Sequence, residues 1–264
     1  MREAERQDQG RILDYLKSEL QDCIYLYIDI MNYGVQGENM KVWLEEEQGE
    51  ILFVAMKYYD SFQLYGPRDG WSIEALCSLL EENPVAMISA RRDILERLES
   101  HLKDYKATYG TVFVVDKYRE LKDAAGILRA TEADAEEIAK LICSDEEIGG
   151  HYTVEGLTAQ LAERIRTGTG RSYIIRENGV LMAHTATYAE AEGVAVVGGT
   201  IIRPEARNTS YFMLITSYMQ QQLAKENKTA YTFSTSEKMV GYHSRIHTKC
   251  GEYGKLEKIK NNKS

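Results

Sequence analysis

The sequence feature that most constrains the fold is an apolar segment that passes through a tight turn into a helix. Residues 194–202 are mostly Val, Ile and Ala between turn signals, which predicts a buried strand. Pro204 ends the strand because proline has no backbone donor for a sheet. Asn208 or Thr209 can cap the next helix, in which apolar residues recur at helical spacing over 212–223.

A strand that enters a helix through such a turn leaves backbone N–H groups unpaired at the helix start. These donors and the helix dipole favour a bound anion, typically a phosphate. The alternative is a connection without a ligand, because many strand–helix turns bind nothing. Local features alone leave both interpretations open.

The stretch resembles the acyl-CoA-binding core of the GNAT superfamily of N-acetyltransferases. In that family a strand leads through a turn written V-x-P-x-x-R-x-x-G-x-G/A into a long helix. The matching residues here are Ile202, Pro204, Arg207, Ser210 and Phe212. The match holds from Ile202 to Arg207, whereas Ser210 and Phe212 stand where the family has small residues that let the backbone approach the CoA pyrophosphate. The resemblance therefore supports the fold better than the activity.

The resemblance implies that acetyl-CoA binds along this turn as acyl donor. The residues expected to contact it are Ile201, Ile202, Arg207, Asn208, Thr209, Ser210, Tyr211 and Phe212. In the family, a backbone N–H of the central strand, matching about Ile202, holds the oxyanion. A tyrosine on the helix after the next strand donates a proton to the departing thiolate. Tyr242 is the nearest candidate, although the Tyr-x-x-x-Gly-Phe continuation is absent and a structural tyrosine is the alternative. No glutamate stands out as general base.

The order of elements over residues 125–259 also resembles the GNAT fold. Residues 131–134 fit a capping box at a helix start. Asn178-Gly179 is a hairpin turn signal, and Gly198-Gly199 fits a bulge in the central strand.

We therefore expect an α/β (α+β) chain with a mixed, mostly antiparallel sheet flanked by helices. Residues 1–120 would form a smaller α/β domain, and residues 125–264 a GNAT-like acyl-CoA-binding domain. The N-terminal half carries no Gly-rich loop, His pair or nucleophile motif, so a structural domain is the simplest interpretation. A degenerate copy of the same fold is the alternative, but no sequence repeat supports it. This half could supply a wall of the substrate site or a homodimer contact.

Two groups of residues raise the question of a metal. Glu45-Glu46-Glu47 would bind one only if the three carboxylates converged, and a solvated hairpin loop is the favoured interpretation. His243 and His247 lie four apart in an expected helix at 238–249, which is the spacing of part of a zinc site. The Glu of H-E-x-x-H is absent, so we expect packing histidines and no metal. A zinc-dependent hydrolase is the weakest function considered.

Composition narrows the class of function. The 264 residues carry a net charge of -9, which disfavours a nucleic-acid binder. No apolar run approaches the length of a membrane span, the charged start is unlike a secretion signal, and the four distant cysteines are typical of reduced thiols. We expect a cytoplasmic N-acetyltransferase acting on a primary amine of a small molecule or peptide, without nucleic-acid or membrane partners. The alternative is a catalytically inactive GNAT-fold binding or interaction protein.

Overall fold

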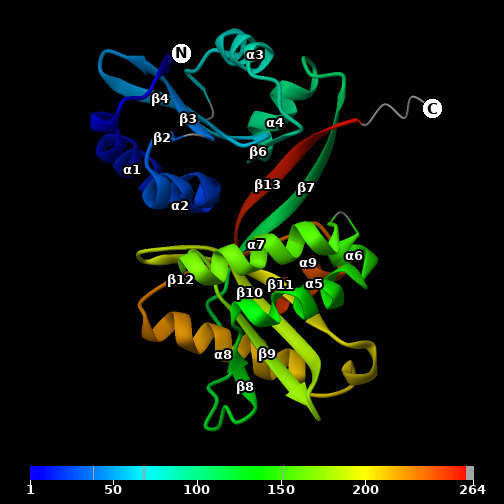
Figure 1. Ribbon diagram of the computed structural model, residues 1–264. Coiled ribbons are helices and arrows are strands. Elements are labelled where there is room, and N and C mark those ends of the chain that lie inside the picture. Colours follow the sequence, from blue (N-terminus) through cyan, green and yellow to red (C-terminus); the bar gives the residue numbers. More distant parts are fainter. Residues whose placement is uncertain (38, 68, 151, 260–264) are drawn as a thin grey trace, which may run out of the picture. The chain divides into compact units, whose positions relative to one another are not determined.

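The computed structural model describes residues 1–37, 39–67, 69–150 and 152–259. By its internal contacts the chain divides into two compact units (Figure 1). The first unit contains residues 1–113, 233–245 and those from 249 onward, and the second contains residues 114–232 and 246–248.

The chain runs twice through one order of elements: strand, two helices, three strands, helix, strand, helix, strand. The first run consists of β1 (Arg2–Glu3), α1 (Gln9–Lys17), α2 (Ile24–Tyr33), β3 (Met40–Glu47), β4 (Glu50–Tyr58), β5 (Ser61–Tyr65), α3 (Ile73–Glu82), β6 (Met87–Arg91), α4 (Arg92–Glu99) and β7 (Tyr105–Val114), with the short strand β2 (Gln36–Gly37) beside β3. The second run consists of β8 (Ile127–Arg129), α5 (Ala135–Cys143), α7 (Val154–Thr167), β9 (Ser172–Glu177), β10 (Val180–Ala191), β11 (Val194–Ile202), α8 (Tyr211–Lys225), β12 (Thr229–Ser234), α9 (Glu237–Ile246) and β13 (Thr248–Lys258), with the short helix α6 (Glu146–Gly149) after α5. The order of elements therefore repeats, although the amino-acid sequence shows no repeat.

The sheet of the first unit has the strand order β1-β3-β4-β5-β6-β13-β7. The neighbours β3, β4 and β5 pair antiparallel, and β5 pairs with β6 in parallel. The last strand, β13, pairs antiparallel with β6 and so completes this sheet from the far end of the chain. The expected domains, 1–120 and 125–264, stay a prediction. The contact-based units differ from them by including β13 and most of α9 in the first unit.

The second unit has the strand order β8-β9-β10-β11-β12, with helices on both faces (Figure 1). Neighbouring strands are antiparallel except β11 and β12, which are parallel. Successive side chains of a strand point to opposite faces. Ile174 accordingly packs in the cluster with α5 and α7, and Ile175 in the cluster with α8. The expected mixed, mostly antiparallel sheet flanked by helices is confirmed.

Several local signals act as predicted. The Thr131–Asp134 capping box has both of its hydrogen bonds. Asn178 and Gly179 both have positive φ, +49° and +82°, as a tight hairpin turn requires. The predicted strand at 194–202 coincides with β11.

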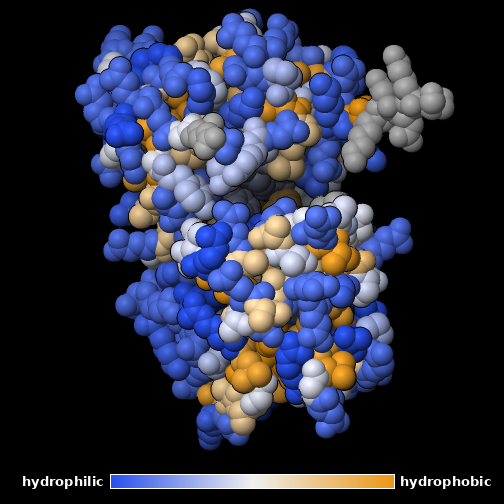
Figure 2. Space-filling view, viewed as in Figure 1, coloured by the Kyte–Doolittle hydropathy of each residue, from blue (hydrophilic) through white to orange (hydrophobic). Residues whose placement is uncertain are grey.

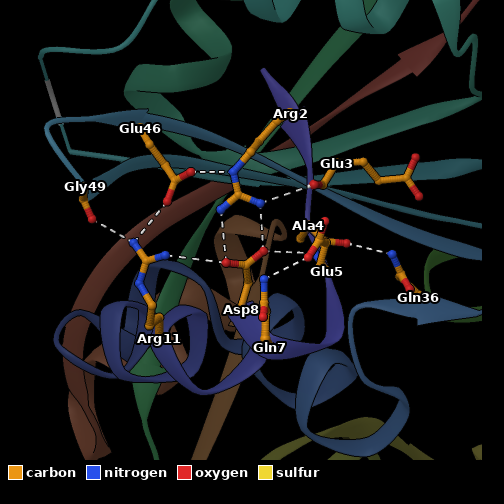
Figure 3. A network of polar contacts seen from close by, with 10 residues as sticks. All are labelled: Arg2, Glu3, Ala4, Glu5, Gln7, Asp8, Arg11, Gln36, Glu46 and Gly49. Carbon is orange, nitrogen blue, oxygen red and sulfur yellow. Dashed lines mark hydrogen bonds and ion pairs between the residues drawn. The ribbon is translucent and has the colours of Figure 1, made fainter.

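The interpretation of residues 45–47 as a solvated loop is wrong, because β3 extends to the end of this run. Glu46 accepts hydrogen bonds from Arg2 (2.5 Å) and Arg11 (3.0 Å), and both guanidinium groups also bind Asp8 (Figure 3). These arginines compensate the charge of Glu46 inside the strand. The sequence hid this pairing because Arg2 is 44 residues away.

No helix among the described residues is both long and apolar enough to cross a membrane. Hydrophilic residues predominate on the face seen in Figure 2. Large apolar side chains that are exposed, such as Leu128 and Val180, are few. Scattered residues of this kind are normal on a protein surface.

Candidate functional site

The central strand of the second unit, β11, has one edge that its neighbour covers only in part. β12 pairs with it from Val194–Thr229 to Val196–Tyr231. On the other edge, β10 pairs with β11 as far as Ile202. Among the described residues, no β12 pairing continues beyond Val196. The rest of this edge therefore offers main-chain groups to a ligand.

The direction of the amides along this edge follows from the pairing with β10. The Arg203 N–H donates to the Met182 carbonyl of β10 at 2.8 Å. Because main-chain groups alternate between the two edges of a strand, the preceding N–H, that of Ile202, points to the opposite edge. This is the amide that the GNAT resemblance implies as oxyanion donor.

β11 contains the bulge that the glycine pair predicts. The register with β10 shifts between His184 and Ala186, and Gly199 has φ +59°. Tyr188 of β10 lies across both glycines. A Cβ atom would stand 2.5 Å from its ring at Gly198 and 2.7 Å from its hydroxyl at Gly199, so neither position admits a side chain without a shift of Tyr188.

A fully buried histidine lies beside the bulge. His184 is 0% exposed, its Nδ1 is 2.9 Å from the Gly199 carbonyl oxygen, and its Nε2 is 3.0 Å from Ser172 Oγ. A carbonyl only accepts, so Nδ1 carries the proton and Nε2 accepts from the serine hydroxyl. Burial lowers the pKa of His184 to about 4, which keeps the imidazole neutral. The sequence shows this histidine only as one polar residue in an apolar strand, and sequence reasoning missed it.

A 3₁₀ turn at Pro204–Ala206 leads from β11 toward α8. The N-cap residue of α8 is Ser210, whose side chain makes no capping hydrogen bond. The predicted caps are therefore one or two residues too early, because the 3₁₀ turn carries the chain further before the helix begins. Thr209 still assists, since its hydroxyl accepts from the Tyr211 N–H at 3.3 Å. Residues 207–210 are exposed, so the helix start is open to solvent.

Comparison with known proteins finds likeness in structure alone. No protein-family model matches the chain, and no curated protein matches its sequence. A Drosophila protein of known structure matches with TM-score 0.70 and 14% identity over 99% of both chains. A GCN5-related N-acetyltransferase from Sphaerobacter thermophilus matches with TM-score 0.60 and 14% identity over 97% of this chain and 93% of its own. A tandem GNAT protein from the clavulanic acid biosynthesis pathway matches with TM-score 0.58 and 12% identity, over 97% and 96%.

The chain has the fold of the GNAT acetyltransferases. The match to a tandem GNAT protein spans nearly the whole chain, in keeping with the element order that occurs twice here. Identities this low show the fold, and the chemistry has to be argued from the site.

Within this GNAT fold, the basic residue of the turn already has a partner. Arg207 donates from Nη2 to Asp145 at 3.1 Å and from Nε to the Ile202 carbonyl at 3.4 Å. Its side chain is 55% exposed, so the ion pair is weak and exchangeable. Ile201, in contrast, is buried against α5 and α7, and its backbone pairs with His184.

The remaining predicted contacts surround the start of α8. Ser210 has φ -79°, which any residue adopts, so the backbone does not need glycine there. The Tyr211 hydroxyl is hydrogen-bonded to Glu177. Phe212 is half-buried in the first turn of the helix. Contact of these residues and of Asn208 with acyl-CoA stays a prediction.

Tyr242 lies on α9 and is 37% exposed. Burial of its ring raises the phenol pKa, so the hydroxyl keeps its proton at neutral pH. The predicted helix 238–249 is too long: α9 ends at Ile246, and His247 lies beyond it. In the part of the chain that the structure describes, no three His, Cys, Asp or Glu side chains gather as metal ligands.

Sequence reasoning also missed a partly buried ion-pair network in the second unit. Arg171 binds both carboxylate oxygens of Glu190 (2.7 and 2.6 Å) and both of Glu226 (2.6 Å each), and Lys228 adds a bond to Glu190. Burial alone would raise the pKa of Glu190, but the bonds from Arg171 and Lys228 outweigh it and lower that pKa. Glu190 pairs with Ala195 near the start of β11. The network therefore anchors the end of the strand opposite the Pro204 turn.

Proposed function

We propose that the second unit binds acetyl-CoA and transfers its acetyl group to a primary amine of a small molecule or peptide in the cytoplasm. The observation that carries the proposal is the combination of an exposed α8 start, with no capping bond from its N-cap side chain, and a β11 edge that β12 leaves uncovered. Both features supply main-chain donors, one to an anion and the other to a carbonyl oxygen.

The site fits the two parts of such a ligand. The pyrophosphate would lie at the exposed residues 207–210, where the helix dipole favours negative charge. The thioester arm would follow β11 toward the Ile202 amide. Phe212 is half-buried and leaves residues 207–210 exposed, although the family has a small residue at its position.

The reaction needs few protein groups. The neutral amine nitrogen attacks the thioester carbonyl carbon, so that a C–N bond forms, and collapse of the adduct breaks the C–S bond. Main-chain N–H groups on β11 would stabilise the oxyanion. The amine releases its proton to solvent, and the departing thiolate takes up a proton. A proton from Tyr242, which belongs to the first unit, stays a prediction of the resemblance.

The Arg207–Asp145 pair gives a matched test of where the ligand binds. Arg207→Ala should weaken acetyl-CoA binding about tenfold, since a charge-assisted contact to phosphate is lost. Asp145→Ala releases the guanidinium and should strengthen binding. Equal affinities in both variants and the wild type would remove the turn from the site.

The first experiment is a thermal shift of the purified protein with acetyl-CoA, with CoA and ATP as controls. A ligand at about a hundred times its Kd stabilises the folded protein by roughly 2.7 kcal/mol. We expect a clear shift with acetyl-CoA and CoA and a smaller one with ATP. No shift with any acyl-CoA would contradict the proposal.

One observation favours the rival, a catalytically silent binding protein of the same fold. Ser210 and Phe212 are larger than the family's small residues at the pyrophosphate turn. A protein that binds acetyl-CoA only after Ser210→Gly and Phe212→Ala are combined would support this rival. Equal binding before and after the change would support the transferase.

A further inference from the structure

The orientation of one peptide in the β11 bulge depends on a side chain of the neighbouring strand. The Gly199 carbonyl oxygen is bonded to His184 Nδ1 of β10 at 2.9 Å. In a trans peptide, this carbonyl and the N–H of the next residue, Thr200, point in opposite directions. The Thr200 N–H is therefore directed away from His184. Among the described residues, no β12 pairing covers the other edge of β11 beyond Val196.

A contact with Ser172 and burial of the ring lock this arrangement. Gly199 has φ +59°, a conformation that glycine adopts at little cost, so its peptide needs another group to hold it. The Ser172 hydroxyl, 3.0 Å from Nε2, occupies the second ring nitrogen and fixes the tautomer with hydrogen on Nδ1. Because Ser172 and the ring are buried and Gly199 is half-buried, water competes little for these hydrogen bonds.

We propose that His184 is a positioning residue for acyl transfer: by holding the Gly199 carbonyl, it aims the Thr200 amide at the thioester oxygen. The inference rests on the proposed function and deepens it, because it assigns the oxyanion contact to an amide within the bulge in addition to that of Ile202. His184 touches no reacting atom, and its part in the reaction is the direction of one hydrogen-bond donor.

The tautomer can be tested without a ligand. Histidine side-chain ¹⁵N spectra of the wild type at neutral pH should show the His184 ring neutral with hydrogen on Nδ1. The signal is assigned by its absence in His184→Asn. Hydrogen on Nε2 would mean that the ring does not donate to the Gly199 carbonyl, and the proposal would be overturned.

The consequence for the ligand can be tested by infrared spectroscopy of acetyl-CoA labelled with ¹³C at the thioester carbonyl. Binding to the wild type should lower the carbonyl stretching frequency. His184→Leu should lose most of this lowering and about tenfold or more in kcat, with CoA affinity unchanged. His184→Asn, whose amide nitrogen replaces Nδ1, should restore much of it.

Thr185→Val is the matched control. It removes the hydrogen bond between Thr185 and Thr200 hydroxyls at the same bulge (2.8 Å) but leaves the Gly199 carbonyl held. The control should keep the lowered frequency. If the carbonyl stretching frequency is lowered in His184→Leu as much as in the wild type, the role of His184 alone is overturned. If the wild type does not bind acetyl-CoA, the proposed function and this inference are overturned together. If His184→Leu does not fold, the tautomer and His184→Asn decide.

Discussion

In each unit one helix connects the two parallel strands, α3 between β5 and β6 and α8 between β11 and β12, and these two helices begin differently. In the first unit, α3 starts with its own anion: both carboxylate oxygens of Glu45 accept from the Ser72 N–H (3.0 and 3.2 Å). The Ser72 hydroxyl also caps the helix by accepting from the Ala75 N–H. In the second unit, the Ser210 side chain makes no capping bond at the start of α8. One helix start is filled by the protein, and the other is open to an external anion.

The strand edges beyond each parallel pair differ in the same way: the protein fills the one in the first unit and leaves the one in the second unit open. In the first unit, β5 and β6 stay parallel only to the Gln63–Ser89 pair. Beyond it, Arg91 donates to the Gly66 carbonyl (3.1 Å), and its guanidinium holds Asp93 and Asp22. The corresponding stretch of β11 and β12 has no such arginine. The comparison teaches that the same order of elements can fill a helix start and a strand edge in one unit and leave both open in the other. On the proposed function, we therefore expect one acyl-CoA per chain.

The largest expected difference between the two units is the change in their stability as the pH falls. Burial lowers the pKa of His184 from 6.5 to about 4, so between these values the unfolded chain binds a proton that the folded second unit does not. The free energy of unfolding should therefore fall by roughly 3 kcal/mol as the pH drops through this window. In the first unit, burial raises the pKa of Asp22, so protonation of this carboxyl favours the folded state on acidification. Hydrogen bonds from Arg2 lower the pKa of Asp8 to about 2, so that carboxyl costs stability only at lower pH.

Hydrogen exchange corrected for intrinsic rates would show the difference. Between about pH 7 and about pH 4.5, amides of β9–β11 should lose protection before those of β3–β5. His184→Asn should reduce this loss. Earlier loss of protection in the first unit would reverse the comparison.

Arg91→Met tests the contacts that Arg91 makes beyond the paired part of β5 and β6 in the first unit. Removing the guanidinium leaves Asp22 partly buried without its partner and should lower the free energy of unfolding by about 2–3 kcal/mol. The affinity for acetyl-CoA should not change. Arg92→Met, next in sequence with an exposed arginine, is the control for urea unfolding and should cost less than about 0.5 kcal/mol. Loss of acetyl-CoA binding in Arg91→Met would move the ligand to the first unit.

Ser210→Asp would make α8 resemble α3. The new carboxylate should cap the helix and raise stability by about 0.5–1 kcal/mol. It should also repel the pyrophosphate and weaken acetyl-CoA binding about a hundredfold, measured by titration calorimetry. Ser210→Asn caps without charge and should bind within a few-fold of the wild type. Tight binding by the aspartate variant would separate the ligand from this helix start.

Glu45→Gln makes the smallest change, at the start of α3. Loss of the negative charge beside the Ser72 amide should lower stability by about 1 kcal/mol in thermal unfolding. Glu47→Gln on the same strand is the control and should stabilise slightly, because Glu47 lies opposite Glu50. If both variants behave alike, Glu45 does not act as the internal anion of α3.

The sequence predicted what depends on neighbouring residues. β11, the Asn178-Gly179 turn and the Gly198-Gly199 bulge follow from local backbone preferences and were confirmed. The extent of α9 was overestimated because polar residues continue a helical pattern past Ile246 into β13.

What the sequence could not show depends on partners far along the chain. His184 acquires its role from Ser172 and Gly199 on two other strands. Glu45 was taken for a loop residue because its partner, Ser72, lies 27 residues on. The repeated topology was hidden because an element order survives changes that erase residue similarity.

Titration calorimetry of the wild type with acetyl-CoA tests the central claim most directly. The account predicts one site per chain, weakened about a hundredfold in Ser210→Asp and unchanged in Arg91→Met. Two sites per chain, or no binding by the wild type, would contradict it.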